Sequence, residues 1–264
     1  MIASGTNSQI KKIKKLKKSA RYRKEEGLFV AEGWKMTEEA IRYGLVRAVY
    51  VSESSMDKWQ EKNLYAQLGK KGTDIPVEQL SSSLFGELSD TVTPQGILAL
   101  VEMPEYHLND MTEDENAALL VLEDIQDPGN LGTMIRTAEG AGMSGVLMSK
   151  GCVDLFNPKV VRSTMGAMFR VPYVVTNDLS TEVERLKEKG FTTYAAHLAG
   201  AKEYTQENYK GKAAVLIGNE ANGLSDKISS QADCLIKIPM EGELESLNAA
   251  VSAALLMYEI HRNR

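Results

Sequence analysis

The sequence predicts an α/β protein of two domains, a small one followed by a larger one built on a parallel sheet. Three features carry this prediction. The chain has 264 residues, whereas one domain usually has about 100–200. Short apolar runs alternate with helical stretches, which is typical of α/β folds. Residues 103–115 are acidic and lack an apolar period, so we predict a linker at 104–115 between domains at 1–103 and 116–264.

The first domain alternates between strands and helices after residue 27. Short apolar runs predict strands over residues 28–31, 46–51, 75–77 and 97–101. Helical patterns cover residues 35–43, 58–68 and 77–88. These elements complete a small α/β unit.

The second domain opens with a nearly continuous apolar run at 117–122, which fits a strand that is covered on both faces. Further strands are predicted over 145–148, 171–175, 192–196, 213–217 and 234–238. Helices are predicted from residue 131 and over 158–165, 181–189, 224–230 and 246–262. This alternation predicts a parallel sheet with helices on both faces.

The last helix carries a stripe of apolar residues that we expect to pack on the sheet. Its members recur at helical spacing: Leu247, Ala250, Val251, Ala254, Leu255 and Tyr258.

Composition excludes several classes of protein. Apolar residues make up 43% of the chain and charged residues 25%, as in ordinary globular proteins. No apolar run approaches the roughly 18 residues of a membrane span. The first residues are polar and then basic, without the apolar segment of a secretory signal, so we expect a cytoplasmic location and no membrane partner.

The cysteines and histidines give no metal or disulfide pattern. Cys152 and Cys234 are far apart and lack a paired spacing. His107, His197 and His261 have no histidine partner three or four residues away. We therefore predict no metal site.

The N-terminal segment is strongly basic. Residues 1–24 contain nine Lys or Arg and no Asp or Glu, whereas the remainder contains 22 basic and 36 acidic residues. A basic segment before an acidic body indicates contact with a polyanion, and we expect it to bind an RNA backbone. The predicted RNA-binding residues are Lys11, Lys12, Lys14, Lys15, Lys17, Lys18, Arg21 and Arg23. A solvated helix with a narrow packed stripe at Ile10, Ile13 and Leu16 is the alternative, and a membrane-surface helix is disfavoured because the apolar face is short.

Common enzyme motifs do not explain the chain. The spacing GxGxxG occurs at Gly140, Gly142 and Gly145, but it follows a helix and precedes a strand, which is the wrong order for a dinucleotide site. No GxxxxGK[ST] phosphate loop and no GxSxG nucleophile elbow is present.

Three segments of the second domain follow predicted strands, where open α/β sheets bind ligands. They are NLGTMIRTA at 130–138, LIGNEANGL at 216–224, and IPM at 238–240 with ESLNAAVS at 245–252. Taken singly, Asn130 and Ser246 are helix caps and Gly218 is a turn residue. Arg136 is harder to explain, because it lies between apolar residues of a helix and indicates an anion or a partner.

Together, the three ordered segments resemble the SpoU/TrmH-type RNA ribose 2′-O-methyltransferases of the SPOUT class. FVAEG at 29–33 and TPQGILALV at 93–101 are similar to the small L30e-like substrate-binding domain that precedes many of these enzymes. The resemblance implies a parallel-sheet SPOUT domain with a C-terminal trefoil knot, a homodimer, and S-adenosylmethionine as cofactor.

The resemblance also implies roles for individual residues. Gly218, Ile238 and Leu247 match the positions that hold the cofactor, and a glycine at 218 lets a ligand approach the backbone. The active-site positions are matched by Arg136, Asn130, Glu220, Ser246 and Asn248. An arginine stays protonated, so Arg136 is expected to orient the ribose 2′-OH together with a substrate phosphate.

Two alternatives remain for the function. The L30e-like resemblance favours structured RNA of the ribosomal type, in 23S rRNA, but a tRNA ribose 2′-O-methyltransferase has the same motifs. A catalytically silent RNA-binding protein of the same fold is the other alternative.

Overall fold

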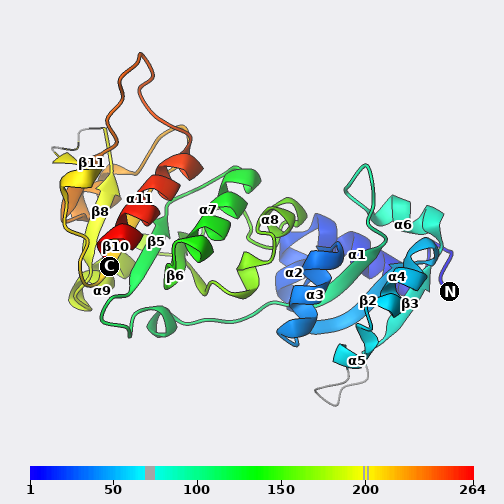
Figure 1. The fold of residues 1–264 in the computed structure, drawn as a ribbon. Coiled ribbons are helices and arrows are strands. Elements are labelled where there is room, and N and C mark those ends of the chain that lie inside the picture. The colour runs from blue at the N-terminus through cyan, green and yellow to red at the C-terminus, as the bar shows by residue number, and fades with distance from the viewer. Residues whose placement is uncertain (69–74, 199, 201) are drawn as a thin grey trace. The chain divides into compact units, whose positions relative to one another are not determined.

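The computed structural model describes residues 1–68, 75–198, 200 and 202–264. It divides into two compact units (Figure 1). Unit 1 comprises residues 1–105 and 154–169, and unit 2 comprises residues 106–153 and 170–264. Residues 154–169 therefore pack with unit 1, although the sequence analysis assigned them to the second domain.

Unit 1 contains a four-stranded mixed sheet in the order β1-β4-β2-β3. Its strands are β1 (Leu28–Glu32), β2 (Val46–Ser52), β3 (Val77–Leu80) and β4 (Ile97–Glu102). Strand β4 is antiparallel to β1 and β2, and β3 is parallel to β2. The helices are α1 (Ser8–Lys18), α2 (Ala20–Glu26), α3 (Trp34–Arg42), α4 (Met56–Glu61), α5 (Tyr65–Leu68), α6 (Ser82–Leu88) and α8 (Pro158–Ser163).

Two predicted elements of unit 1 were wrong in their bounds. The predicted helix over 77–88 begins only after Ser81, whose hydroxyl accepts a hydrogen bond from the Leu84 N–H. Residues 77–80 form β3 instead, because pairing with β2 satisfies their backbone groups and overrides the local helical pattern. The predicted helix over 58–68 is two short helices, which are separated by Asn63 in a left-handed conformation (φ 48°).

Helix α1 is part of the core of unit 1. The helical spacing that was predicted for Ile10, Ile13 and Leu16 is confirmed, and all three side chains are fully buried. They belong to one apolar cluster with residues of the sheet such as Val30 and Leu98. The basic segment is thus a structural helix whose apolar stripe stabilises the unit.

Unit 2 contains a seven-stranded parallel sheet in the order β7-β6-β5-β10-β8-β11-β9, which confirms the predicted parallel sheet. Its strands are β5 (Ala118–Leu122), β6 (Gly145–Ser149), β7 (Tyr173–Thr176), β8 (Thr192–Ala196), β9 (Lys202–Glu203), β10 (Ala213–Ile217) and β11 (Cys234–Lys237). The helices are α7 (Pro128–Gly140), α9 (Leu179–Glu188), α10 (Asp226–Gln231) and α11 (Ala249–Asn263).

Both faces of this sheet are covered. Leu119 and Val121 of β5 pack in one cluster with side chains of α9 and α10. Helices α7 and α11 pack against one another, and α11 also contacts β5 and β10. Every residue of β5 and β10 is buried, as expected for central parallel strands.

The predicted packing face of the last helix was only partly correct, since Ala250 is buried as expected. Val251 and Tyr258 are 48% and 50% exposed, whereas Leu256, Met257 and Ile260 are fully buried. Both sides of the helix carry apolar residues, so periodicity alone does not identify the side that faces the sheet. One apolar face of α11 is consequently left exposed.

No helix in the described part of the chain is both long enough and apolar enough to span a bilayer.

Replacing Ile13 by alanine should destabilise the protein by about 2–5 kcal/mol, because the lost side chain leaves a cavity in a packed core. Chemical denaturation measures this change. Lys11→Ala on the exposed side of the same helix is the control, and it should change stability by no more than about 0.5 kcal/mol. Equal stability of the two variants would show that α1 does not belong to the core.

Candidate functional site

The three motif segments meet at the carboxyl ends of β5, β10 and β11, and the second and third line one cavity. Its volume is about 540 Å³. Five of the predicted site residues line it, namely Gly218, Glu220, Ile238, Ser246 and Leu247. Apolar side chains form part of its wall, including Ile217, Leu224 and Met240. The cavity therefore joins segments that are distant in the sequence.

Glu220 connects the first and second segments. One of its carboxylate oxygens accepts a hydrogen bond from the Gln126 N–H, at 3.0 Å. The other accepts from the Asp127 N–H and from the Asn130 side-chain amide, both at 3.0 Å. Three donors, one in the first segment and two just before it, thus converge on one acid of the second.

These bonds keep Glu220 ionised. Burial by itself raises the pKa of Glu220, but the hydrogen bonds from Asn130 and from the backbone of Gln126 and Asp127 outweigh it, and the pKa lies below its usual value. A carboxylate with a lowered pKa and occupied oxygens is a poor proton acceptor. Glu220 is therefore suited to hold the site together.

Asn130 and Asn248 extend this network to the third segment. The Asn130 side-chain oxygen accepts a hydrogen bond from the Asn248 side-chain amide at 3.0 Å. The Asn248 oxygen in turn caps α11 by accepting from the N–H groups of Ala250 and Val251. Asn130, Glu220 and Asn248 are thus brought together, and they link all three segments.

The caps of two helices differ from the prediction. Asp127, not Asn130, caps α7, and Pro128 occupies the first turn. The Asn130 side chain is therefore available for Glu220. Asn248, not Ser246, caps α11, and Ser246 is an exposed residue of the cavity wall.

Gly218 is required by the loop itself. A Cβ at this position would lie 2.0 Å from the carbonyl carbon of Gly223 and 2.1 Å from the nitrogen of Leu224. The sequence analysis explained this glycine by the approach of a ligand, but the nearest obstacle is the backbone of its own loop. Ile238 and Leu247 are half-buried on the cavity wall.

Arg136 does not line the cavity in the single chain. It is exposed on α7, and it has no hydrogen-bond or ion-pair partner among the described residues. Thr133, one turn earlier, lines a shallow groove with the exposed residues Val251 and Tyr258 of α11. Arg136 is thus free to meet an anion.

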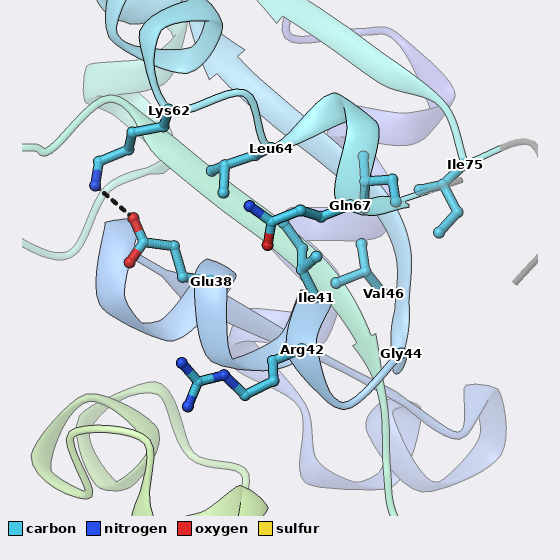
Figure 2. Close-up of a pocket in the computed structure, with 10 residues that line it drawn as sticks. Glu38, Ile41, Arg42, Gly44, Val46, Lys62, Leu64, Gln67 and Ile75 are labelled. Atoms are coloured by element: carbon cyan, nitrogen blue, oxygen red, sulfur yellow. Dashed lines mark ion pairs between the residues drawn. The ribbon is translucent and has the colours of Figure 1, made fainter. Parts of the chain in front are cut away.

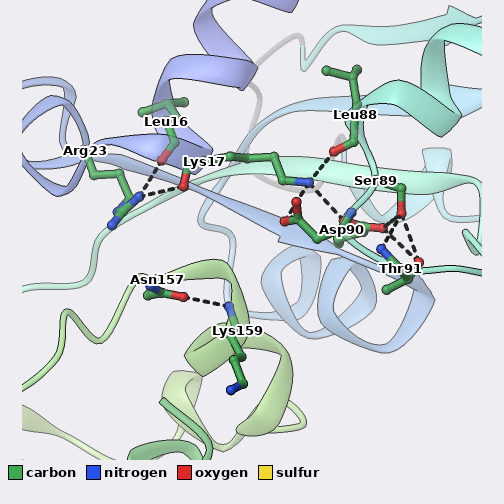
Figure 3. Close-up of polar contacts among 10 residues, drawn as sticks. Leu16, Lys17, Arg23, Leu88, Ser89, Asp90, Thr91, Asn157 and Lys159 are labelled. Carbon is green, nitrogen blue, oxygen red and sulfur yellow. Dashed lines mark hydrogen bonds and ion pairs between the residues drawn. The ribbon is translucent and has the colours of Figure 1, made fainter. Parts of the chain in front are cut away.

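Two of the predicted RNA-binding residues are held inside unit 1 (Figure 3). The Lys17 ammonium pairs with Glu32 at 3.2 Å and with Asp90 at 2.9 Å, and its side chain is only 8% exposed. Arg23 is buried, and its guanidinium donates to the Leu16 carbonyl at 2.6 Å and to Asp154. These partners account for both charges, so the prediction of a direct RNA contact needs correction at Lys17 and Arg23.

The other predicted RNA-binding residues fall into two groups. Lys12, Lys14 and Arg21 pair with glutamates at distances of 2.6 to 3.3 Å. Lys11, Lys15 and Lys18 are exposed, and Lys15 lies over the Tyr22 ring at 3.8 Å. Because their spacing is i, i+4 and i+7, these three lysines share one face of α1.

A second cavity lies in unit 1, between α3, β2 and α5 (Figure 2). Its volume is about 500 Å³, and Ile41, Val46 and Leu64 contribute to its wall. Lys62 and Glu38 form an ion pair at its edge, at 2.7 Å. None of the predicted site residues lines it.

Sequence reasoning missed two acids that shape the second segment. Glu123 accepts hydrogen bonds from the backbone N–H and the hydroxyl of Ser225, both at 2.7 Å. The Asp124 carbonyl accepts from the Asn219 side-chain amide at 2.8 Å. Both acids directly follow the buried run of β5, which is the signal that could have identified them.

Within the described residues, no group of three or more His, Cys, Asp or Glu side chains is arranged to hold a metal ion.

Comparison with known proteins identifies the family. The model of the SpoU rRNA Methylase family matches residues 117–258, which include all three segments. The chain belongs to the SpoU family of RNA 2′-O-methyltransferases. The model of the MRM3-like substrate binding domain matches residues 7–99. The resemblance seen in the sequence is thereby confirmed for both parts of the chain.

Full-length relatives share this organisation. The 23S rRNA (guanosine(2553)-2′-O)-methyltransferase RlmP of Bacillus subtilis (strain 168) is 34% identical over 260 residues, which cover 98% of each chain. The AdoMet-bound rRNA methyltransferase from Sinorhizobium meliloti is 29% identical, with a TM-score of 0.88 over 99% of this chain and 97% of that one. The SpoU methyltransferase AviRb from Streptomyces viridochromogenes, in complex with the cofactor AdoMet, is 27% identical, with a TM-score of 0.84 over 97% of each chain.

Gly218→Ala should destabilise the protein by about 1–3 kcal/mol, because the added methyl group overlaps the backbone of Gly223 and Leu224. Gly242→Ala is the matched control, since a Cβ there meets no atom within 4 Å. Chemical denaturation of both variants measures the difference. If both are as stable as the wild type, the loop does not require a glycine at position 218, and a ligand is the remaining explanation.

Proposed function

We propose that this enzyme transfers a methyl group from S-adenosylmethionine to a ribose 2′-OH of 23S rRNA. One observation carries the proposal: the three segments inside the SpoU match form one network around Glu220, beside a cavity of suitable size. Its relative in Bacillus subtilis acts on a guanosine ribose of 23S rRNA.

The cavity fits the cofactor. Its volume of about 540 Å³ lies within the usual range of about 300–1,000 Å³ for small-molecule sites. Ile238 and Leu247 offer apolar surface for an adenine ring, and the loop at 218–224 lines the cavity beside them. When bound, S-adenosylmethionine supplies an activated methyl group on a sulfonium sulfur.

The residues of the site have different proposed roles in alignment, in orientation of the 2′-OH and in contact with the substrates. Glu220, Asn130 and Asn248 fix the relative positions of the three segments, and this alignment supplies much of the rate enhancement of an in-line transfer. Arg136 is the exposed cation that orients the 2′-OH and an adjacent phosphate. Ser246 lies on the cavity wall, where its hydroxyl can contact the RNA or the cofactor.

The proposal includes a C-terminal knot. Strand β11 lies between β8 and β9 in the sheet, and we infer that the chain that runs from β8 to β10 encloses it. A Cβ at Gly200 in that chain would lie 2.6 Å from the carbonyl carbon of Ile236 in β11, so the two backbones are in close contact. Because α11 then packs on β10 and β5, we infer that the C-terminal segment is threaded through this enclosure.

The proposal also includes a homodimer. The exposed face of α11 and Thr133 of α7 form an apolar groove, with Val251, Leu255 and Tyr258 at its surface. Exposed apolar surface of this kind is typical of an interface. A second copy of the chain that binds there would also surround Arg136, which lies outside the cavity in the single chain.

Unit 1 is proposed to bind the RNA backbone. It carries 18 Lys or Arg and 15 Asp or Glu, whereas unit 2 carries 13 and 21. Lys11, Lys15 and Lys18 are the contacts that we propose, because they are exposed on one face of α1. The domain limits 1–103 and 116–264 are retained as part of the proposal except for residues 154–169, which pack with unit 1. The cytoplasmic location is also retained as part of it.

The activity is tested by mapping ribose methylation after incubation of the enzyme with S-adenosylmethionine and unmodified RNA. We expect one new 2′-O-methyl group in 23S rRNA. Methylation of tRNA instead would identify the tRNA alternative, and methylation of neither RNA would favour a silent RNA-binding protein.

Arg136→Ala should lower single-turnover methyl transfer about a hundred-fold, because the acceptor is no longer aligned. Arg136→Lys should restore little activity, since an ammonium lacks the planar fork of a guanidinium. Sedimentation and denaturation of the same variants show whether the dimer and the fold persist. Near-normal transfer by a stable Arg136→Ala dimer would refute the role of Arg136.

The triple variant Lys11→Ala, Lys15→Ala, Lys18→Ala should bind RNA more weakly and with a smaller salt dependence. Each lost phosphate contact should reduce the slope of log K against log salt by about 0.7–0.9. Lys12→Ala with Lys14→Ala is the matched control on the same helix, because these lysines already pair with glutamates. If both variants reduced the salt-dependence slope equally per lysine, RNA binding would not be confined to the face of α1 that carries Lys11, Lys15 and Lys18.

A further inference from the structure

Asp124 has an unusual backbone conformation directly beside the site. Its φ is 52°, in the left-handed region, and it is one of three non-glycine residues with positive φ in the described part of the chain. It follows β5 and precedes the segment that binds Glu220. Aspartate tolerates this region better than most residues, but it occupies the region only when other contacts hold it there.

Ser149 at the end of β6 supplies these contacts. The Ser149 hydroxyl donates a hydrogen bond to an Asp124 carboxylate oxygen at 2.6 Å. The Asp124 N–H donates to the same hydroxyl oxygen at 2.9 Å. Gly151 leaves room for this carboxylate, because a Cβ at position 151 would lie 1.9 Å from the Asp124 oxygen.

The turn at Asp124 directs polar groups toward the site. Its carbonyl oxygen accepts hydrogen bonds from the side-chain amides of Asn219 at 2.8 Å and Gln126 at 3.0 Å. The N–H groups of Gln126 and Asp127 follow directly, and both bind Glu220. Asp124 therefore contacts Asn219 of the second segment directly. Its conformation also determines the direction of the backbone at Gln126 and Asp127, whose N–H groups bind Glu220.

We propose that Asp124, clamped by Ser149, is a positioning residue for methyl transfer. This inference rests on the proposed function. Asp124 acts through Glu220, which holds Asn130, and it does not itself touch the reacting groups. The side chain and the N–H of Asp124 bond to Ser149, while its carbonyl oxygen accepts from Asn219 and Gln126 beside the site, so loss of the clamp should move the site loops with little effect on the core.

Three substitutions of Asp124 separate the hydrogen bond from the backbone conformation. Asp124→Ala removes the acceptor and disfavours the left-handed conformation, so kcat should fall about ten-fold to a hundred-fold. Asp124→Asn keeps an acceptor oxygen and tolerates positive φ, and it should stay within about three-fold of the wild type. Asp124→Gly keeps the conformation without the acceptor and should be intermediate.

A substitution of Ser149, the partner of Asp124, tests the same hydrogen bonds and can be compared with a matched control. Ser149→Ala removes the partner of Asp124 and should lower kcat as Asp124→Ala does. Ser144→Ala removes a similar bond, from the Ala118 N–H at 3.1 Å, at the other end of β5 and β6. It should lower thermal stability to a similar extent and leave kcat unchanged.

Each variant is measured by single-turnover methyl transfer to rRNA, by calorimetric affinity for S-adenosylmethionine, and by thermal unfolding. The proposal requires a loss of kcat with the Kd for S-adenosylmethionine retained, and rescue by asparagine. If Ser149→Ala and Ser144→Ala have equal kcat, or if asparagine does not rescue, the role of Asp124 is structural only. Failure of the proposed function would appear separately, as absence of methyl transfer by the wild type.

Discussion

The arrangement of the site depends on one interaction, the acceptance of three hydrogen bonds by the Glu220 carboxylate. Glu220 and Asn130 are 90 residues apart in the chain, and Asn130 and Asn248 are 118 residues apart. The parallel sheet brings their segments to one edge. The topology of the sheet alone, however, does not fix the positions of the side chains to within a fraction of an ångström. Hydrogen bonds to an ionised acceptor are stronger than those between neutral groups, and they provide this alignment.

The same interaction limits what Glu220 can do chemically. A carboxylate whose oxygens are already occupied, and whose pKa is lowered by those bonds, gains little by accepting a further proton. The geometry therefore favours alignment of the segments, and not proton transfer, as the task of Glu220.

The location of the site could be predicted from the sequence, whereas the packing of the side chains around it could not. The parallel sheet and the meeting of the three segments follow from strands that alternate with helices, because ligand loops of such sheets lie at one edge. The packing face of α11 could not be predicted, since Val251 and Leu256 are equally apolar and only the complete fold distinguishes them. Likewise, Lys17 and Arg23 look like their exposed neighbours in the sequence, and only the tertiary partners Asp90 and Asp154 show that they are held inside.

Gly218 was correctly predicted as a residue of the site, but the sequence explained only part of the reason for a glycine at this position. A glycine after a strand indicates a close approach by some atom, and the sequence cannot say whether that atom belongs to a ligand or to the chain. In the structure the approaching atoms are those of Gly223 and Leu224, which close the loop on itself. The closed loop also lines the cavity, so the internal contact and the binding of a ligand are separate requirements on the same residue. Substitutions at Gly218 therefore report first on the loop and only then on the cofactor, which is why the cofactor assignment depends on the neighbouring side chains of Ile238 and Leu247.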